Sequence, residues 1–183
     1  MDFPLLRNGV HSSKPLNTTR YARQKISNTN KIVIHTANAG DARAVLGNQG
    51  AAMRLSHDHR VDDPNEVERI NRAGGFLFKG RVLGVLAVTR SLGDHCMKEF
   101  VIAKPHYNET AIHCQNTAEQ GQEEYPPVLI LACDGLWDVM QDQEAVDLVL
   151  SFMGDRADSA QFLVEEAIRR GSTDNVSVVV AWL

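Results

Sequence analysis

The amino-acid sequence predicts an α+β fold, in which strands and helices are grouped along the chain instead of alternating. β-rich runs are concentrated in residues 31–56, two amphipathic helical patterns follow at 142–153 and 158–172, and a β-branched run occupies 174–183. Grouped strands, then helices, then one returning strand favour α+β over an alternating parallel architecture. We expect one domain, since 183 residues are enough for a single core.

The elements before the first helix follow from turn and strand signals. Residues 1–30 are polar and show no sustained period, which predicts a flexible lead-in or loop. In residues 31–56, turn signals at Gly40-Asp41 and at 47–50 separate three β-rich runs. This pattern predicts an antiparallel meander of three strands.

A short helix is expected directly after these strands. Asp63 is suited to the N-cap, Pro64 to the first helical position and Glu66 to a capping box, while Gly74 and Gly75 mark the end. The next segment is apolar but interrupted by glycines, which favours short strands and turns. Residues 111–127 are polar and end in two prolines, which predicts an exposed connection before the next buried strand.

Composition narrows the possible partners. The formal net charge of −4 gives no broad basic surface for nucleic acid, and no apolar run is long enough to span a membrane. The three cysteines are odd in number and not clustered, which favours reduced thiols over disulfides or a zinc site. We therefore expect a cytoplasmic and/or nuclear protein, whose oligomeric state no pattern indicates.

Four aspartates stand out because of their positions relative to strands. Asp134 follows the buried strand at 128–133, Asp138 comes one turn later, Asp174 precedes the final strand, and Asp41 lies in a turn between strands. An unpaired carboxylate beside apolar sequence is costly to desolvate, so these groups require cations. Oxygen ligands without accompanying histidine or cysteine select Mg²⁺ or Mn²⁺ over Zn²⁺.

Each of these residues also has a structural interpretation. A single Asp beside Gly is more often a turn former than a ligand, and Asp138 is equally suited to cap the following helix. The metal hypothesis therefore rests on the set of four. His57 and His59 form an HDH sequence in a polar turn, which indicates a solvated pair more than a pair of metal ligands.

The sequence as a whole resembles a known family. The motifs ANAGDARAVL, AVTRSLGD, LACDGLWDV and STDNVSVVV occur in this order and resemble those of the metal-dependent (PPM, type 2C) serine/threonine protein phosphatases. The resemblance implies an αββα sandwich of two antiparallel sheets flanked by helices, with a metal centre between the sheets. Residues 31–183 match the C-terminal part of that domain, so we expect the sandwich to be incomplete at its N-terminus.

The resemblance also assigns residues and an activity. It implies that Asp134 and Asp174 are direct ligands in a centre of two or more Mg²⁺ or Mn²⁺ ions, and that Asp41 and Asp138 serve an additional ion and its water shell. The implied reaction is hydrolysis of phosphoserine and phosphothreonine in phosphoproteins by metal-activated water. No residue is assigned a direct catalytic role, and residues 55–90 resemble the flap that influences substrate choice.

The sequence departs from the family in one respect. An acidic segment, a phosphate-binding Arg and an Asp-Gly-His-Gly motif, which belong to the N-terminal half of the family domain, do not occur. A non-catalytic PPM-like binding or regulatory fragment therefore stays open as the alternative. A haloacid-dehalogenase-type phosphotransferase is a poorer match, since Ala132 stands where its nucleophilic Asp would be. We expect Arg43 and Asp94, inside the matched motifs, to have supporting roles.

Overall fold

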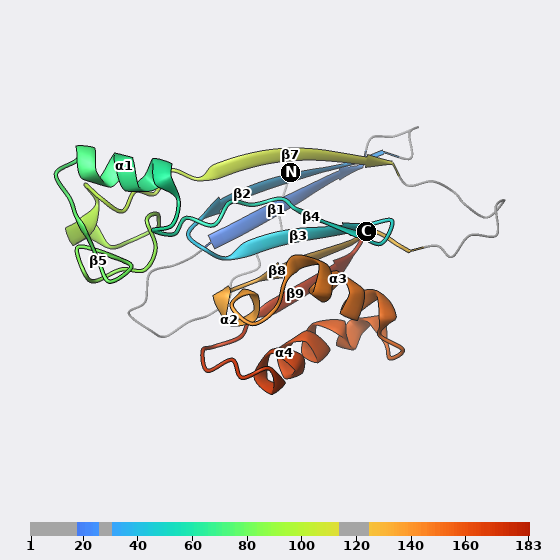
Figure 1. Ribbon diagram of the computed structural model, residues 1–183. Helices are drawn as coiled ribbons and strands as arrows, with labels where there is room; N and C mark the ends of the chain where they lie inside the picture. Colours follow the sequence, from blue (N-terminus) through green and yellow to red (C-terminus); the bar gives the residue numbers. More distant parts are fainter. Residues whose placement is uncertain (1–17, 26–30, 114–124) are drawn as a thin grey trace.

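Two antiparallel sheets lie face to face, and helices cover the outer face of one of them (Figure 1). This computed structural model describes residues 18–25, 31–113 and 125–183. It confirms the α+β class, because all strand pairs are antiparallel and the helices α2, α3 and α4 are grouped between the last two strands.

The two sheets differ in size. The smaller has the order β1 (Thr18–Lys25), β2 (Lys31–Ala39), β7 (His106–His113). The larger has the order β4 (Ala51–Arg54), β3 (Arg43–Asn48), β8 (Val128–Ala132), β9 (Val178–Trp182). Against the larger sheet lie α2 (Asp134–Trp137), α3 (Asp142–Ser151) and α4 (Ser159–Arg169), with the 3₁₀ turn η2 (Arg156–Asp158) before α4.

A separate small unit lies at one end of the sandwich (Figure 1). It contains α1 (Pro64–Arg72), the hairpin of β5 (Leu77–Phe78) and β6 (Arg81–Val82), and the 3₁₀ turn η1 (His95–Met97). Ile70, Val82 and Val101 form its own small core. Residues 55–90, most of this unit, are called the flap below.

Helix α1 begins and ends as predicted, with one difference. The Asp63 carboxylate accepts a hydrogen bond from the backbone N–H of Asn65, Pro64 is the first helical residue, and Gly74 follows the end with φ of 82°. The predicted capping box is wrong. Glu66 is buried and forms ion pairs instead, because two arginine side chains reach it inside the flap.

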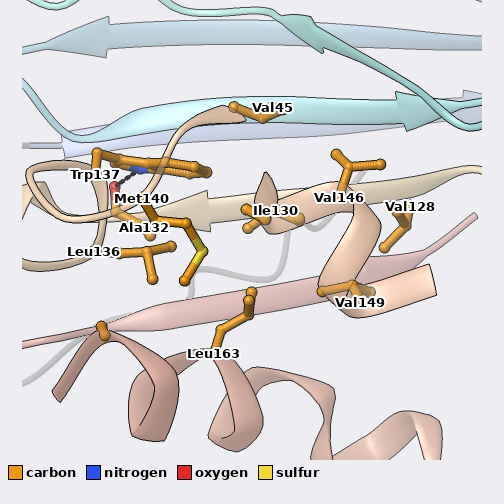
Figure 2. Close-up of a cluster of buried hydrophobic side chains, with 12 residues drawn as sticks. Val45, Val128, Ile130, Ala132, Leu136, Trp137, Met140, Val146, Val149 and Leu163 are labelled. Atoms are coloured by element: carbon orange, nitrogen blue, oxygen red, sulfur yellow. Dashed lines mark hydrogen bonds between the residues drawn. The ribbon is translucent and has the colours of Figure 1, made fainter. Parts of the chain in front are cut away.

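The central strands β3 and β8 of the larger sheet are buried on both faces, which explains their continuous apolar runs. Alternate residues of β3 and β8 point to the helices or to the smaller sheet. The helix side contains Val45, Val128, Ile130, Ala132, Leu136, Trp137, Met140, Ala145, Val146, Val149, Leu163 and Ala167 (Figure 2). The layer between the sheets contains Ile32, Ile34, Ala44, Leu46, Leu55, Ile112 and Leu129.

The predicted three-stranded meander is wrong in one part. Strands β3 and β4 pair as a hairpin, but β2 pairs with β1 and β7 in the other sheet. Residues 40–42 therefore carry the chain from one sheet to the other instead of forming a hairpin turn. A short Gly-Asp turn can close a hairpin or carry the chain to another sheet. The crossing is favoured here because it lets both faces of β3 be buried.

Other expectations about single segments also need revision. Residues 18–25 form strand β1 inside the range expected to be a lead-in, and the remainder of 1–30 lies outside the described residues. Residues 111–113 belong to β7 and not to the expected connection, of which 114–124 lie outside the described part. The helical pattern expected at 142–153 extends past the helix, because α3 ends at Ser151 and Met153 is 97% exposed.

The helical layers are unequal. In the described ranges, no helix packs on the outer face of the β1–β2–β7 sheet, so this part of the chain forms a ββα arrangement with the flap at its end. The described helices include none that is long and apolar enough to cross a membrane.

Candidate metal centre

The four predicted aspartates lie at the end of the sandwich that carries the flap. Asp41 is on the connection between the sheets, Asp134 is the first residue of α2, Asp138 is its C-cap, and Asp174 is in the loop before β9. Figure 1 shows α2 and the flap helix α1 at the same end. Asp41 is almost completely buried, Asp134 is one-third exposed, and the other two are exposed.

An arginine from the flap connects three of these carboxylates. Arg60 Nε donates a hydrogen bond to Asp41 Oδ2 at 2.9 Å, and its Nη1 lies 2.9 Å from Asp138 Oδ1. Its Nη2 lies 3.7 Å from Asp134 Oδ2. The three nitrogens of one guanidinium therefore face three different carboxylates. Sequence reasoning missed Arg60, because no local pattern shows that the start of the flap faces residues 41 and 134.

The fourth aspartate is held near Asp134 by contacts between two loops. Ser172 Oγ donates to the Gly135 carbonyl at 2.6 Å, and Cys133 Sγ donates to the Asn175 carbonyl at 3.1 Å. A Cβ built on Gly135 would lie 2.3 Å from that same Asn175 oxygen. Only glycine at this position allows the loop that carries Asp174 to approach the start of α2 so closely.

The charges in this group are not balanced. Burial, and then the negative charge of Asp134, raise the pKa of Asp41 although Arg60 lowers it. The pKa of Asp134 is raised by burial, by Asp138 and by Asp174. Burial alone would lower the pKa of Arg60, but Asp41 and Asp138 raise it above its ordinary value. One guanidinium therefore does not neutralise the carboxylates around it.

The donor set suits a hard divalent cation. All four side chains offer carboxylate oxygens, and the positively charged guanidinium of Arg60 already lies between three of them. Within the described ranges, however, no group of three or more His, Cys, Asp or Glu side chains is arranged to hold a metal ion. The negative charge and the oxygen donors of the cluster fit Mg²⁺ or Mn²⁺. The distances between the carboxylates in this structure fit the guanidinium of Arg60.

The backbone that presents Arg60 is anchored by the residue before it. The backbone N–H of His59 donates to the Gly40 carbonyl at 3.0 Å, and its carbonyl accepts from the N–H of Thr89 at 2.8 Å. Burial, and then the positive charge of Arg90, lower the pKa of His59 to about 4. The expected solvated histidine pair is therefore wrong for His59, whereas His57 is exposed.

Two other motif residues have contacts that support the surrounding structure. Arg43 binds Asp58 at the start of the flap and donates from Nη1 to Asp142 Oδ1 of α3 at 2.6 Å. Asp94 accepts a hydrogen bond from Ser91 Oγ at 2.7 Å in a left-handed backbone conformation. Neither residue makes a described contact with the four aspartates.

Comparison with known proteins gives one consistent family. The family model described as Protein phosphatase 2C matches residues 21–176. Protein phosphatase 2C homolog 1 of Schizosaccharomyces pombe is 49% identical over 153 residues, which are 84% of this chain and 41% of that protein. Protein phosphatase 2C homolog 1 of Saccharomyces cerevisiae is 41% identical over 150 residues, 82% of this chain and 50% of that protein.

Solved structures agree with this match. A phosphatase from a pathogenic strain of Toxoplasma gondii is similar with a TM-score of 0.71 and 32% identity, over 84% of this chain and 49% of that one. A Caenorhabditis elegans sex determining protein gives a TM-score of 0.68 at 29% identity, over 83% of this chain and 38% of that one. The chain thus spans half or less of the length of these relatives.

Proposed function

Because this chain belongs to the protein phosphatase 2C family, we propose that it is the C-terminal part of a metal-dependent serine/threonine phosphatase domain. Its substrates in this proposal are phosphoproteins that carry phosphoserine or phosphothreonine. The observation that supports it best is the convergence of Asp41, Asp134 and Asp138 on one cation position, with Asp174 held beside Asp134 by the loop contacts.

Each carboxylate has a proposed role. Asp134 and Asp174 bind the catalytic pair of Mg²⁺ or Mn²⁺ ions, and Asp41 and Asp138 hold an additional ion through its water shell. Bound divalent ions supply an activated water and neutralise charge on the phosphoryl oxygens. Asp41, almost completely buried, keeps a fixed orientation, whereas the exposed Asp138 is accessible to solvent and substrate.

We place the protein in the cytoplasm and/or the nucleus. This part of the proposal rests on the unclustered cysteines, of which Cys96 and Cys133 are free thiols in the described residues. Neither nucleic acid nor a membrane is proposed as a partner.

A second function is favoured by Arg60. A chain in which a guanidinium faces three of the predicted metal ligands is suited to bind a phosphoprotein or a regulator without hydrolysis. In this alternative the chain has the family fold but does not hydrolyse phosphoserine or phosphothreonine.

A complementation assay tests both proposals. The 183-residue chain is incubated with Mn²⁺ and a phosphothreonine peptide, alone and with the separately expressed N-terminal half of a related phosphatase. We expect very low turnover alone and clear turnover in the mixture, because catalytic groups that act as a unit lose most of their effect when one is missing. Asp134→Asn should abolish the turnover, and Asp147→Asn, an exposed aspartate on α3, should leave it unchanged.

The possible outcomes separate the candidates. A mixture that binds the peptide without turnover supports the binding fragment and contradicts the phosphatase. Ordinary turnover by the soluble, monomeric chain alone, sensitive to Asp134→Asn, would show that the N-terminal motifs are dispensable.

A further inference from the structure

We propose that Arg60 is a built-in competitor of the divalent cation, whose guanidinium occupies the cation position in the metal-free chain and leaves when the metal binds. The inference rests on the proposed function, because it requires the carboxylates to be metal ligands. It adds a property of this chain's own flap, namely that metal affinity is set partly by a residue that binds no metal.

The contacts of Arg60 are the first step of the argument. Its Nε, Nη1 and Nη2 face Asp41, Asp138 and Asp134, which are three of the four predicted ligands. Mg²⁺ binds carboxylate oxygens directly at about 2.1 Å or holds them through its coordinated waters, and in both cases the ion must lie between them. The guanidinium nitrogens lie 2.9, 2.9 and 3.7 Å from oxygens of Asp41, Asp138 and Asp134, so the group fills the space between them and the two cations exclude each other.

The freedom of the side chain is the second step. The backbone of Arg60 is fixed by a bridge to Val88 and by the neighbouring hydrogen bonds of His59. Its side chain, in contrast, is 32% exposed to solvent. Exchange with a metal ion therefore requires a change of rotamer and no unfolding of the flap.

The net charge of the cluster is the third step. The guanidinium of Arg60 carries one positive charge and faces the carboxylates of Asp41, Asp134 and Asp138, so a divalent cation in its place matches their negative charge more closely. A competitor that occupies the site most of the time lowers the apparent affinity by the fraction of time that the site is open. The strength of metal binding is thus tuned by how firmly Arg60 is held.

The test is a calorimetric titration of the full chain with Mn²⁺, for wild type, Arg60→Gln, Arg60→Lys and Arg54→Gln. We expect Arg60→Gln to bind Mn²⁺ about tenfold more tightly or better, corresponding to a site that is open about a tenth of the time in the wild type. The Mn²⁺ affinity of Arg60→Lys should lie between those of wild type and Arg60→Gln, because an ammonium group cannot contact three carboxylates as the planar guanidinium does. Arg54 pairs with Asp142 at 2.8 Å and with Asp58 at 3.7 Å, and neither is one of the four predicted ligands, so Arg54→Gln should leave the affinity unchanged.

Thermal unfolding gives a second measurement. Without metal, Arg60→Gln should melt at a lower temperature than the wild type, because three carboxylates lose their counter-ion. Saturating Mn²⁺ should raise its melting temperature more than it raises that of the wild type.

Three results would overturn the inference. A folded Arg60→Gln chain that binds Mn²⁺ no more tightly than the wild type shows that Arg60 does not compete. If Arg60→Gln does not fold, an affinity of Arg60→Lys that equals or falls below the wild-type value leads to the same conclusion. If no variant binds Mn²⁺, the proposed metal-dependent function fails as well, whereas equal binding by wild type and Arg60→Gln leaves that function intact.

Discussion

At the scale of single residues, Gly135 allows close packing between the start of α2 and the loop that carries Asp174, a proposed metal ligand. Its missing side chain makes room for the carbonyl of Asn175, next to Asp174. We expect Gly135→Ala to lower the free energy of unfolding by about 1–3 kcal/mol, because the two loops must separate. The same separation should weaken Mn²⁺ binding, measured by calorimetry beside thermal unfolding.

Gly74→Ala is a suitable control for this prediction. Nothing lies within 4 Å of a Cβ on Gly74, although its positive φ strains any other residue, so the variant should lose stability without losing metal affinity. A Gly135→Ala chain that is destabilised yet binds Mn²⁺ normally would separate the loop contact from the site.

At the scale of elements, α1 is fastened to the rest of the flap by a buried ion-pair group. Glu66 is 2% exposed and pairs with Arg90 at 2.6 Å and Arg69 at 2.9 Å. Burial alone would raise the pKa of Glu66, but hydrogen bonds from Arg90 and Arg69 lower it to about 2. The stability that this carboxylate contributes is therefore complete above pH 4.5 and is lost as the pH falls toward 2.

The corresponding variant is Glu66→Gln, which leaves two arginines without their counter-charge. We expect it to lower the free energy of unfolding by about 3 kcal/mol at pH 7, and by much less at pH 3, as measured by urea unfolding at both values. Glu68→Gln removes an exposed pair with Arg72 on the same helix and should change stability only slightly. Equal effects of the two substitutions would mean that the buried group does not fasten α1.

The elements that could be predicted from sequence are those with local causes. The start of α1 follows from Asp63 and Pro64, and the final strand from its β-branched run, so both were predictable without knowledge of the fold. The crossing at 40–42 was not, because the choice of sheet depends on which faces become buried. The aspartates were identified as a set, whereas Arg60 became visible only when the flap was placed against them.

At the scale of the whole molecule, the smaller sheet presents a long edge strand, β7, to other chains. No described strand pairs with the second edge of β7, and Tyr107 on that strand is 60% exposed. An open, eight-residue edge strand is a template for pairing. We expect self-association that increases with concentration in sedimentation velocity, and we expect Ala111→Lys on β7 to reduce it.

The control for this prediction adds the same charge elsewhere. Ala157→Lys, at an exposed position in η2, should leave self-association unchanged. If both lysines reduce association equally, net charge and not the edge of β7 is responsible.

The crossing at residues 40–42 makes the position of one carboxylate depend on how the two sheets are aligned. Asp41 follows the last residues of β2 in the smaller sheet, while Asp134 follows β8 in the larger one. A slip of one sheet over the other by a single residue is about 3.3 Å. The 2.9 Å hydrogen bond between Arg60 Nε and Asp41 Oδ2 would not survive a shift of that size. Such a slip would therefore remove Asp41 from the cluster. Binding of a cation at the cluster thus reports that the two sheets are aligned as in the native fold, because apolar contacts between the sheets define their alignment less sharply.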